Sequence, residues 1–463
     1  MDQNLLSTLF EYSYTVVIVG LLYYFLRTSF KKSGKQLLLH WILFGFIVNV
    51  YGLSWLYTAY PLEWMKQGII QLFALGALHL ILSVSTALSY IPLALARHKK
   101  IPQEFLPLVF ASLLVIAEVG RALIISMLYY KEGTATLGLH FTAGTIGNAL
   151  STTPLIEFAY FGGTFALTFV LGYLVYVGSS KQHVLQYWKH ALGIMVVLVC
   201  VHFFIPAPLP KEGTSIGIIT TNFTLPKNVE GYGEAFKEQE KKVHDMTLQL
   251  ASSSPSFIVY PEDTRYITNL TPSHKTDLLI LFGNTLFIDG DTIPTKNGYS
   301  NVSLFYYPKR TKISVRGKEF LLPFNEYLPL VFESIFKPFV PEGEMESYTK
   351  LHTYASVVSD KTVIFNKTRI GTLLCSEILS FSVVNALKKE NPDIVFFQSR
   401  MNVFHNNIWT IMHMRSFTKV AATQLRKPFV SSISGAPSFV ISPHGKMLLF
   451  IPTGLSSTIY TFK

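Results

Sequence analysis

Three apolar runs in the second half of the chain lead into residues that could do nucleophilic chemistry. The run FIVYPED contains Glu262, VRGKEFLLPFNEY contains Lys318 and Glu326, and GTLLCSE contains Cys375 and Glu377. A carboxylate can take the proton of a thiol, and a lysine can stabilise the oxyanion of a tetrahedral intermediate. Together these residue types favour covalent catalysis through the thiol of Cys375.

Each of these residues alone has a simpler interpretation. A lone cysteine is more often a small buried hydrophobic residue than a nucleophile. Glu262 alone would be a capping or salt-bridging residue, and Lys318 alone would be a solvated charge at the end of a strand. The catalytic interpretation therefore depends on the elements that bring the residues together.

The composition divides the chain into two unlike halves. Of 463 residues, 49% are hydrophobic and only 14% are charged, whereas soluble proteins carry about 25% charged residues. Residues 1–206 hold 19 charged residues, and residues 207–463 hold 48. We therefore expect a membrane domain over 1–207 and a water-soluble catalytic domain over 208–463, joined by the Pro-rich segment IPAPLPKEGT.

About six stretches of the first half are apolar and long enough to span a bilayer, which needs about 20 helical residues. These predicted spans are 12–30, 37–60, 68–96, 105–129, 159–180 and 190–207. No basic residue precedes the first span and no small-residue cleavage site follows it. We therefore expect it to be a retained helix and not a cleaved signal peptide.

Basic residues in the loops predict the orientation of these spans. Those that follow the first, third and fifth spans are Arg27, Lys31, Lys32, Lys35, Arg97, Lys99, Lys100, Lys181 and Lys189. The alternate loops hold only Lys66 and Lys131. The positive-inside rule then places the amino terminus and everything after residue 207 outside the cytoplasm.

Two charged residues lie inside the fourth predicted span. Glu118 and Arg121 are three residues apart and so share one helical face. Charges within a membrane are costly and usually paired, which predicts a mutual ion pair. The alternative is that the two residues position lipid headgroups or the uncharged, Gly- and Thr-rich loop that follows within 131–158.

Short apolar runs alternate with helical patterns after the Pro-rich junction. The predicted strands are 216–223, 257–262, 277–283, 302–307, 369–375, 393–399 and 428–434, and the predicted helices are 232–252, 380–390 and 404–425. This alternation is typical of a layered α/β or α+β domain.

Two cysteines are too few for a disulfide framework or a cysteine-rich zinc site. Cys200 lies in an apolar run, remote in sequence from Cys375, so we expect both to be free. The net charge of +11 lies largely in loops between apolar runs, and no basic stripe with interleaved aromatic residues is present. We therefore expect no nucleic-acid partner, no metal ion and no cofactor.

The stretch KEFLLPFNEYLP (318–329) closely resembles the K-x-x-L-V-P-F-G-E-x-x-P signature of the bacterial apolipoprotein N-acyltransferases, which belong to the carbon–nitrogen hydrolase (nitrilase) superfamily. Weaker similarities occur at 52–57, 152–171 and 434–445. The resemblance implies an α-helical transmembrane bundle followed by a nitrilase-like αββα sandwich. It also implies a multi-pass protein of the bacterial inner membrane with its catalytic domain on the periplasmic side.

The resemblance also implies a role for each candidate residue. Glu262 would be the general base, Lys318 would stabilise the oxyanion, and Cys375 would be the nucleophile that forms an acyl thioester. Glu326 would be an accessory acid of the active site, and Glu377 would orient the lysine or structure the site. Two rivals for the lysine role lie nearby, but the eight-residue step to Glu326 is the family's own and favours Lys318. The rivals are Lys309 and Lys312.

The implied reaction moves an acyl chain from a phospholipid, through the thioester, to the amino-terminal amine of a diacylglyceryl-cysteine apolipoprotein. The partners would be the phospholipid donor, the apolipoprotein acceptor and the membrane. Two alternatives remain: a membrane-tethered amidase or nitrilase in which water resolves the acyl-enzyme, and a catalytically silent descendant that binds lipoproteins.

The chain departs from the family pattern at four points, of which the stretch 399–406 and Gln424 motivate the silent alternative. Ser376 replaces the usual tyrosine, and SRMNVFHN (399–406) replaces a stretch that shapes the substrate entrance. Gln424 stands where a glutamate is expected, and the usual membrane helix after the catalytic domain is missing. None of these departures removes the glutamate, lysine or cysteine.

Overall fold

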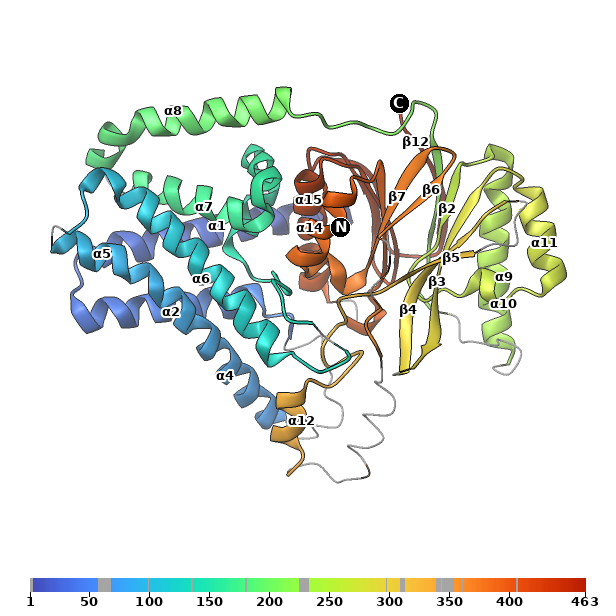
Figure 1. The fold of residues 1–463 in the computed structure, drawn as a ribbon, viewed down its shortest axis with the longest axis horizontal. Coiled ribbons are helices and arrows are strands. Elements are labelled where there is room, and N and C mark those ends of the chain that lie inside the picture. The colour runs from blue at the N-terminus through green and yellow to red at the C-terminus, as the bar shows by residue number, and fades with distance from the viewer. Residues whose placement is uncertain are drawn as a thin grey trace.

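The computed structural model describes residues 3–56, 68–98, 100–134, 136–179, 181–224, 233–296, 298–308, 313–338, 343, 354–357, 359, 361–404 and 407–463. Figure 1 shows a helical half joined to an α/β half, with the long helix α8, Lys181–Phe204, leading from one to the other. The predicted order of a helical region followed by a layered α/β region is confirmed.

The helical half consists of long apolar helices and a buried irregular segment. The α-helices besides α8 are α1 Gln3–Ser29, α2 Gly34–Gly52, α4 Gly68–Thr86, α5 Tyr90–Arg97, α6 Leu106–Leu128 and α7 Ala159–Gly178. The short 3₁₀ helices η3, Ile146–Thr152, and η4, Pro154–Phe158, precede α7. Trp41, Phe44, Phe110 and Tyr176 form the centre of the apolar core of this half.

Five stretches of helix in the described residues are long and apolar enough to cross a membrane: Gln3–Ser29, Leu75–Ala96, Gln103–Leu128, Pro154–Gly178 and Tyr187–Phe204. The predicted span 37–60 falls on α2, which is not among the five, and its last residues, 57–60, lie outside the described residues. Lys35, His40 and Asn49 reduce the apolar character of α2.

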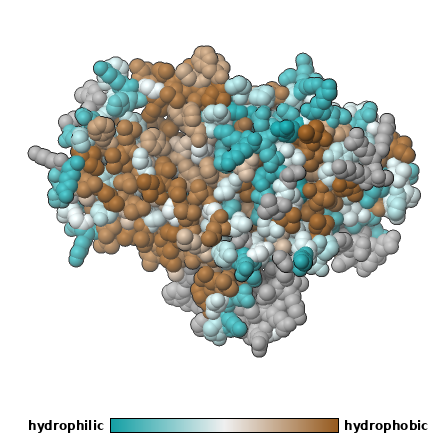
Figure 2. Space-filling view, viewed as in Figure 1, coloured by the Kyte–Doolittle hydropathy of each residue, from teal (hydrophilic) through white to brown (hydrophobic). Residues whose placement is uncertain are grey.

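The outer surface of these helices is strongly apolar. Figure 2 shows brown atoms over most of the helical half, with teal atoms at its far end and over the α/β half. Large exposed apolar side chains include Val16, Leu39, Phe203 and Phe204. The α1–α2 turn, the end of α5 and the start of α8 lie together at the end of the helical half that is distant from the α/β half (Figure 1). The three basic loops thus lie on one side, as the positive-inside rule requires.

The charged pair in α6 anchors the segment that follows the helix. Arg121 Nε lies 2.7 Å from Glu118 Oε2, which confirms the predicted ion pair. Arg121 also donates to Ala143 O at 2.7 Å and to Thr145 Oγ1 at 2.6 Å, and Glu118 Oε1 accepts from Ile146 N at 3.2 Å. The pair therefore also positions the loop, so that the two interpretations of its role are compatible.

Two six-stranded sheets form the α/β half. One has the order β12-β1-β2-β3-β4-β5 and the other has the order β11-β10-β9-β8-β7-β6. The strands of the first are β12 Ser456–Thr461, β1 Ser215–Thr220, β2 Phe257–Val259, β3 Leu286–Thr295, β4 Gly298–Tyr306 and β5 Ile313–Gly317. Those of the second are β11 Met447–Ile451, β10 Ser438–Ile441, β9 Phe429–Ser434, β8 Ile394–Arg400, β7 Thr368–Leu374 and β6 Thr362–Phe365.

Apolar side chains from both sheets form the core between them. Ile218, Val259 and Ile288 of the first sheet belong to one buried cluster with Phe396 and Val430 of the second. The outer layers are helical (Figure 1). Helices α9 Glu234–Gln249, α10 Tyr266–Asn269 and α11 Pro272–Leu281 lie outside the first sheet, and α14 Phe381–Glu390 and α15 Ile408–Leu425 lie outside the second.

One predicted strand is wrong. Residues 277–283 belong to helix α11 and the turn after it. The helix begins at Pro272 directly after Thr271, whose side chain accepts a hydrogen bond from His274 N. Thr at the N-cap followed by Pro at the first position is a strong helix start. It outweighs the strand-like run DLLILFG, whose residues Ile280 and Leu281 are exposed.

The other six predicted strands coincide with β1, β2, β4, β7, β8 and β9, and the three predicted helices coincide with α9, α14 and α15. The sequence did not reveal β3, β5, β6, β10, β11 or β12. Of these, β10, β11 and β12 are antiparallel strands joined by short turns.

Helix α15 joins the two halves. Glu11 of α1 is buried between Arg415 Nε at 2.5 Å and Lys419 Nζ at 2.6 Å. Gln424, on the same helix, lies against α7 at Gly163, where φ is +55° and an added Cβ would lie 2.4 Å from Gln424 Oε1. Gly163 therefore permits both a break in α7 and its close approach to α15.

The Glu118–Arg121 pair predicts an asymmetric response to mutation. Arg121→Gln leaves the Glu118 carboxylate buried without its cation, and breaking a buried pair in this way costs about 3–5 kcal/mol. The double variant Glu118→Gln/Arg121→Gln leaves no unpaired charge, so it should unfold at a higher temperature than the single variant. Thermal unfolding in detergent measures both, and a double variant less stable than the single one would contradict this role for the pair.

Candidate active site

The ends of the two sheets bring four of the five candidate residues to one buried cavity. Glu262 follows β2, Lys318 follows β5 and Cys375 follows β7, while Glu326 lies in the turn after Lys318. These four residues line a cavity of about 30 Å³, which is large enough for about one water molecule. The other residues that line it are Asp263, Asn301, Leu322, Asn325, Tyr354 and Arg400.

Lys318 lies between two carboxylates. Its Nζ is 3.0 Å from Glu262 Oε1 and 2.9 Å from Glu326 Oε1. Glu326 is held in turn by Leu322 N, which donates to Oε2 at 2.5 Å. Burial alone would lower the pKa of Lys318, but the two carboxylates raise it above its usual value. The lysine is therefore a permanent cation and hydrogen-bond donor, and not a base.

Glu262 is suited to accept a proton. Burial is the largest influence on its pKa and raises it, Lys318 opposes this effect, and the net shift is upward. A raised pKa brings a carboxylate closer to neutral pH, where it can both accept and return a proton. Gly290 of β3 permits this position, since a Cβ there would lie 2.8 Å from the Cα of Glu262.

Cys375 is buried and is a neutral thiol in the resting state. Burial and the Glu262 carboxylate raise its pKa to about 12, although Lys318 acts in the opposite direction. The thiol therefore needs a base during attack. Its backbone has a φ of +43°, and φ is also positive at Asp263 and Phe324. Non-glycine residues in this left-handed region are strained and occur preferentially at functional sites.

Glu377 lies outside the cavity and fastens the strands that carry the site. Its carboxylate accepts from Arg316 Nη1 at 2.5 Å and from Arg316 Nη2 at 2.9 Å, in a pair that is almost fully buried. It also accepts from Leu374 N at 2.8 Å and Glu319 N at 2.7 Å. These bonds connect the residues directly before Cys375 and directly after Lys318. The sequence predicts that Glu377 either orients the lysine or structures the site, and these contacts support the second role.

Of the six lining residues that were not identified from the sequence, Asn301 and Arg400 donate hydrogen bonds to carboxylates of the cavity. Asn301 Nδ2 donates to Glu326 Oε1 at 2.5 Å and to Glu262 Oε1 at 3.4 Å, and so bridges the two carboxylates. Arg400 lies in the stretch 399–406, at the end of β8, and donates to Asp263 Oδ2 at 2.6 Å. Arg400 adds a second positive charge to the cavity, and its position directly after an apolar run was the available signal.

The remaining sequence predictions fall elsewhere. Lys309 and Lys312 lie outside the described residues, as do residues 405 and 406 of the altered stretch. Gln424, where the family resemblance predicts a glutamate, is not among the residues that line the cavity. Cys200 is exposed on α8 and Cys375 is buried, and both are free, as expected.

No family model and no curated protein matches the sequence. The α/β half is similar in structure to the glutamine-dependent NAD⁺ synthetase from Acinetobacter baumannii, with 14% identity over 54% of this chain and 46% of that one and a TM-score of 0.38. The chain thus spans about half the length of that synthetase.

The α/β half is also similar to an amidase from Nesterenkonia sp. AN1, at 8% identity over 54% of this chain and 93% of that one with a TM-score of 0.38. A mutant of that amidase is described as from the nitrilase superfamily. It matches at 9% identity over 55% of this chain and 92% of that one, with a TM-score of 0.36. Likenesses of this size assign neither a family nor an activity, so the function depends on the chain's own residues.

Glu377 and an exposed glutamate should differ sharply in their effect on stability. Glu377→Gln leaves Arg316 buried without its counter-ion and should lower the free energy of unfolding by about 3–5 kcal/mol. Glu333→Gln removes only a partly exposed pair with Lys131 and should change it by at most about 1 kcal/mol. Denaturant unfolding of both variants measures the difference, and equal effects would contradict the fastening role.

The electrostatics predict that Glu262→Gln makes the thiol more acidic. Because the Glu262 carboxylate raises the pKa of Cys375, removing its charge should move that pKa down from about 12. In a Cys200→Ala background, alkylation of Cys375 by iodoacetamide should increase with pH, and the increase should begin at lower pH in the Glu262→Gln variant. Identical pH profiles would show that the two residues are not coupled.

Proposed function

We propose that this chain is a membrane N-acyltransferase. In the proposed reaction it moves an acyl chain from a phospholipid to Cys375 and then to the amino-terminal amine of a diacylglyceryl-cysteine apolipoprotein. The observation that carries the proposal is the meeting of Cys375, Glu262, Lys318 and Glu326 in one buried cavity. The proposed location is the bacterial inner membrane, with the cavity on the periplasmic side.

In the first half-reaction the Sγ of Cys375 attacks the carbonyl carbon of the phospholipid ester, and the thiol proton passes to Glu262. The oxyanion that forms faces the ammonium of Lys318. Collapse of the tetrahedral intermediate breaks the ester bond, and the lysophospholipid oxygen takes the proton back from Glu262. The acyl chain is then held as a thioester, in a site where Lys318 supplies a fixed positive charge away from water.

In the second half-reaction the amine of the acceptor attacks the thioester carbonyl and gives a proton to Glu262. The thiolate of Cys375 leaves and recovers this proton, while the acyl chain forms an amide with the acceptor. Glu326 keeps Lys318 paired throughout, since Glu262 is neutralised twice in each cycle, once in each half-reaction. A second carboxylate therefore prevents Lys318 from being left with a neutral partner.

The position of the cavity next to apolar surface supports a lipid substrate over a small soluble amide. Tyr327, directly after Glu326, donates to Tyr129 O at the end of α6. Helix α12, Leu330–Phe336, follows and exposes Leu330 and Ile335. The segment from the cavity to α12 thus leads to the helical half (Figure 1), where an acyl chain could approach along apolar side chains.

A transfer assay tests the proposal. Detergent-purified protein, given a phospholipid with a labelled sn-1 chain and a synthetic diacylated lipopeptide, should produce a triacylated peptide and a lysophospholipid. Glu262→Gln should reduce the product by at least about 100-fold, because a general base contributes about 10²–10⁴-fold. Cys200→Ala should leave the rate unchanged.

The products distinguish the alternatives. Free fatty acid without acylated peptide would replace the proposal with a membrane-tethered hydrolase. A folded protein that releases neither product would indicate the catalytically silent descendant. A Glu262→Gln variant with an undiminished rate would remove Glu262 as the base.

A further inference from the structure

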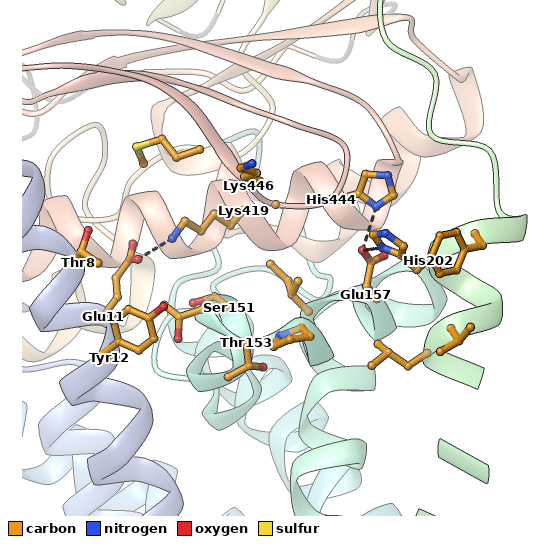
Figure 3. Close-up of a pocket in the computed structure, with 18 residues that line it drawn as sticks. Thr8, Glu11, Tyr12, Ser151, Thr153, Glu157, His202, Lys419, His444 and Lys446 are labelled. Atoms are coloured by element: carbon orange, nitrogen blue, oxygen red, sulfur yellow. Dashed lines mark hydrogen bonds and ion pairs between the residues drawn. The ribbon is translucent and has the colours of Figure 1, made fainter. Parts of the chain in front are cut away.

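A second cavity, of about 560 Å³, lies between the helical half and the α/β half. Figure 3 shows its labelled side chains converging from α1, the segment η3–η4, α8, α15 and the turn between β10 and β11. Glu11 and Lys419 form an ion pair on one side of it, and Glu157, His202 and His444 meet on the other. None of these five residues lines the cavity beside Cys375.

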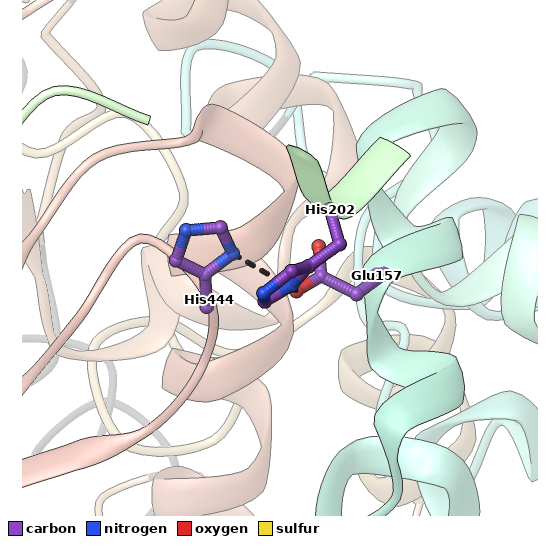
Figure 4. Close-up of side chains that lie close together, drawn as sticks. All are labelled: Glu157, His202 and His444. Atoms are coloured by element: carbon purple, nitrogen blue, oxygen red, sulfur yellow. Dashed lines mark hydrogen bonds and ion pairs between the residues drawn. The ribbon is translucent and has the colours of Figure 1, made fainter. Parts of the chain in front are cut away.

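Glu157, His202 and His444 together offer the donor atoms of a metal site. His202 Nδ1 and His444 Nδ1 each lie 2.9 Å from the same oxygen, Glu157 Oε1. The three ligand atoms lie within 4.8 Å of one another, and Figure 4 shows both imidazoles directed at the carboxylate. Zinc binds imidazole nitrogen and carboxylate oxygen at about 2.0–2.2 Å. Ligand atoms that share one ion are therefore about 3 Å apart, close to the observed spacing.

Arg426 lies beside both His444 and Glu157. Arg426 Nη1 lies 3.0 Å from His444 Nδ1 and 2.5 Å from Glu157 Oε2. If His444 Nδ1 is unprotonated, it accepts from Arg426 and cannot donate to Glu157 Oε1, which lies 2.9 Å away. If it carries a proton instead, it faces the arginine donor. Neither neutral tautomer satisfies both contacts. A metal ion bound to Nδ1 and Oε1 would take the lone pair of Nδ1, and Arg426 would keep its contact with Glu157 Oε2.

We propose that Glu157, His202 and His444 bind a divalent transition-metal ion, with zinc as the best match. Two imidazoles and one carboxylate form a set that zinc accepts with a fourth position left open. Arg426 would hold the outer oxygen of Glu157 and so orient Oε1, as partners of metal-bound carboxylates do. The side chains of His202 and His444 are 48% and 32% exposed, so the open position would face the cavity and hold water.

A metal ion here would connect three parts of the chain. Glu157 belongs to η4 in the helical half, His202 lies near the end of α8, and His444 lies in the β10–β11 turn of the α/β half. Only 18% of the apolar stretch Tyr187–Phe204 of α8 is buried. The proposed ion would fix the end of this helix against the catalytic half, independently of the acyl-transfer chemistry.

Metal analysis of the full chain tests the proposal. Protein purified in detergent without a polyhistidine tag or chelator, exposed to Zn²⁺ and then desalted, should retain one equivalent of zinc by mass spectrometry. The double variant His202→Gln/His444→Gln should retain at least tenfold less. His274→Gln, which alters an exposed histidine on α11, is the matched control and should retain as much zinc as the unaltered chain.

A second measurement avoids dependence on the variants. Co²⁺ added to the unaltered, EDTA-treated chain should produce visible absorption bands of a low-coordinate nitrogen and oxygen site, and Zn²⁺ should abolish them. In EDTA the unaltered chain and the double variant should unfold at similar temperatures. Equal zinc retention in the double variant, or no cobalt bands and no retained zinc in the unaltered chain, would overturn the proposal.

Discussion

The candidate active site depends on one buried ammonium group. Lys318 Nζ is shared by Glu262 and Glu326 at 3.0 and 2.9 Å, and the lysine side chain is only 2% exposed. If both carboxylates were absent, burial would lower the pKa of Lys318 and favour its neutral form. The pair of acids therefore keeps a positive charge in a buried cavity, where it can act on a developing oxyanion. The same charge partly offsets the effects of burial and of Glu262 on Cys375.

The rest of the fold holds this arrangement in place. The Arg316–Glu377 pair connects the residues next to Lys318 and Cys375, so the lysine and the thiol are fixed relative to each other. Helix α15 covers the sheet that carries Cys375 and is joined to α1 through Glu11. The helical half thus packs directly on the α/β half.

The site was largely predictable from the sequence because its residues follow apolar strands. Polar residues in or directly after such runs identified Glu262, Lys318, Glu326 and Cys375, and the eight-residue step to Glu326 favoured Lys318 over its two rivals. Contacts between residues far apart in the chain could not be predicted in this way, because no local sequence pattern marks them. Glu157 is 287 residues from His444, and the inward direction of Asn301 depends on the register of β4. The run 277–283 was misassigned because a short, continuous apolar run resembles a buried strand, whereas Thr271 and Pro272 before it begin a helix.

The central claim is that the thiol of Cys375 carries the acyl group, and direct detection of that intermediate tests it most directly. Detergent-purified protein would be incubated with a tagged phospholipid and no acceptor, then digested and mapped by mass spectrometry. The account predicts one hydroxylamine-labile acyl group on the peptide that contains Cys375, and none in a Cys375→Ala variant. A folded, unmodified protein, or an adduct on another residue, would contradict it.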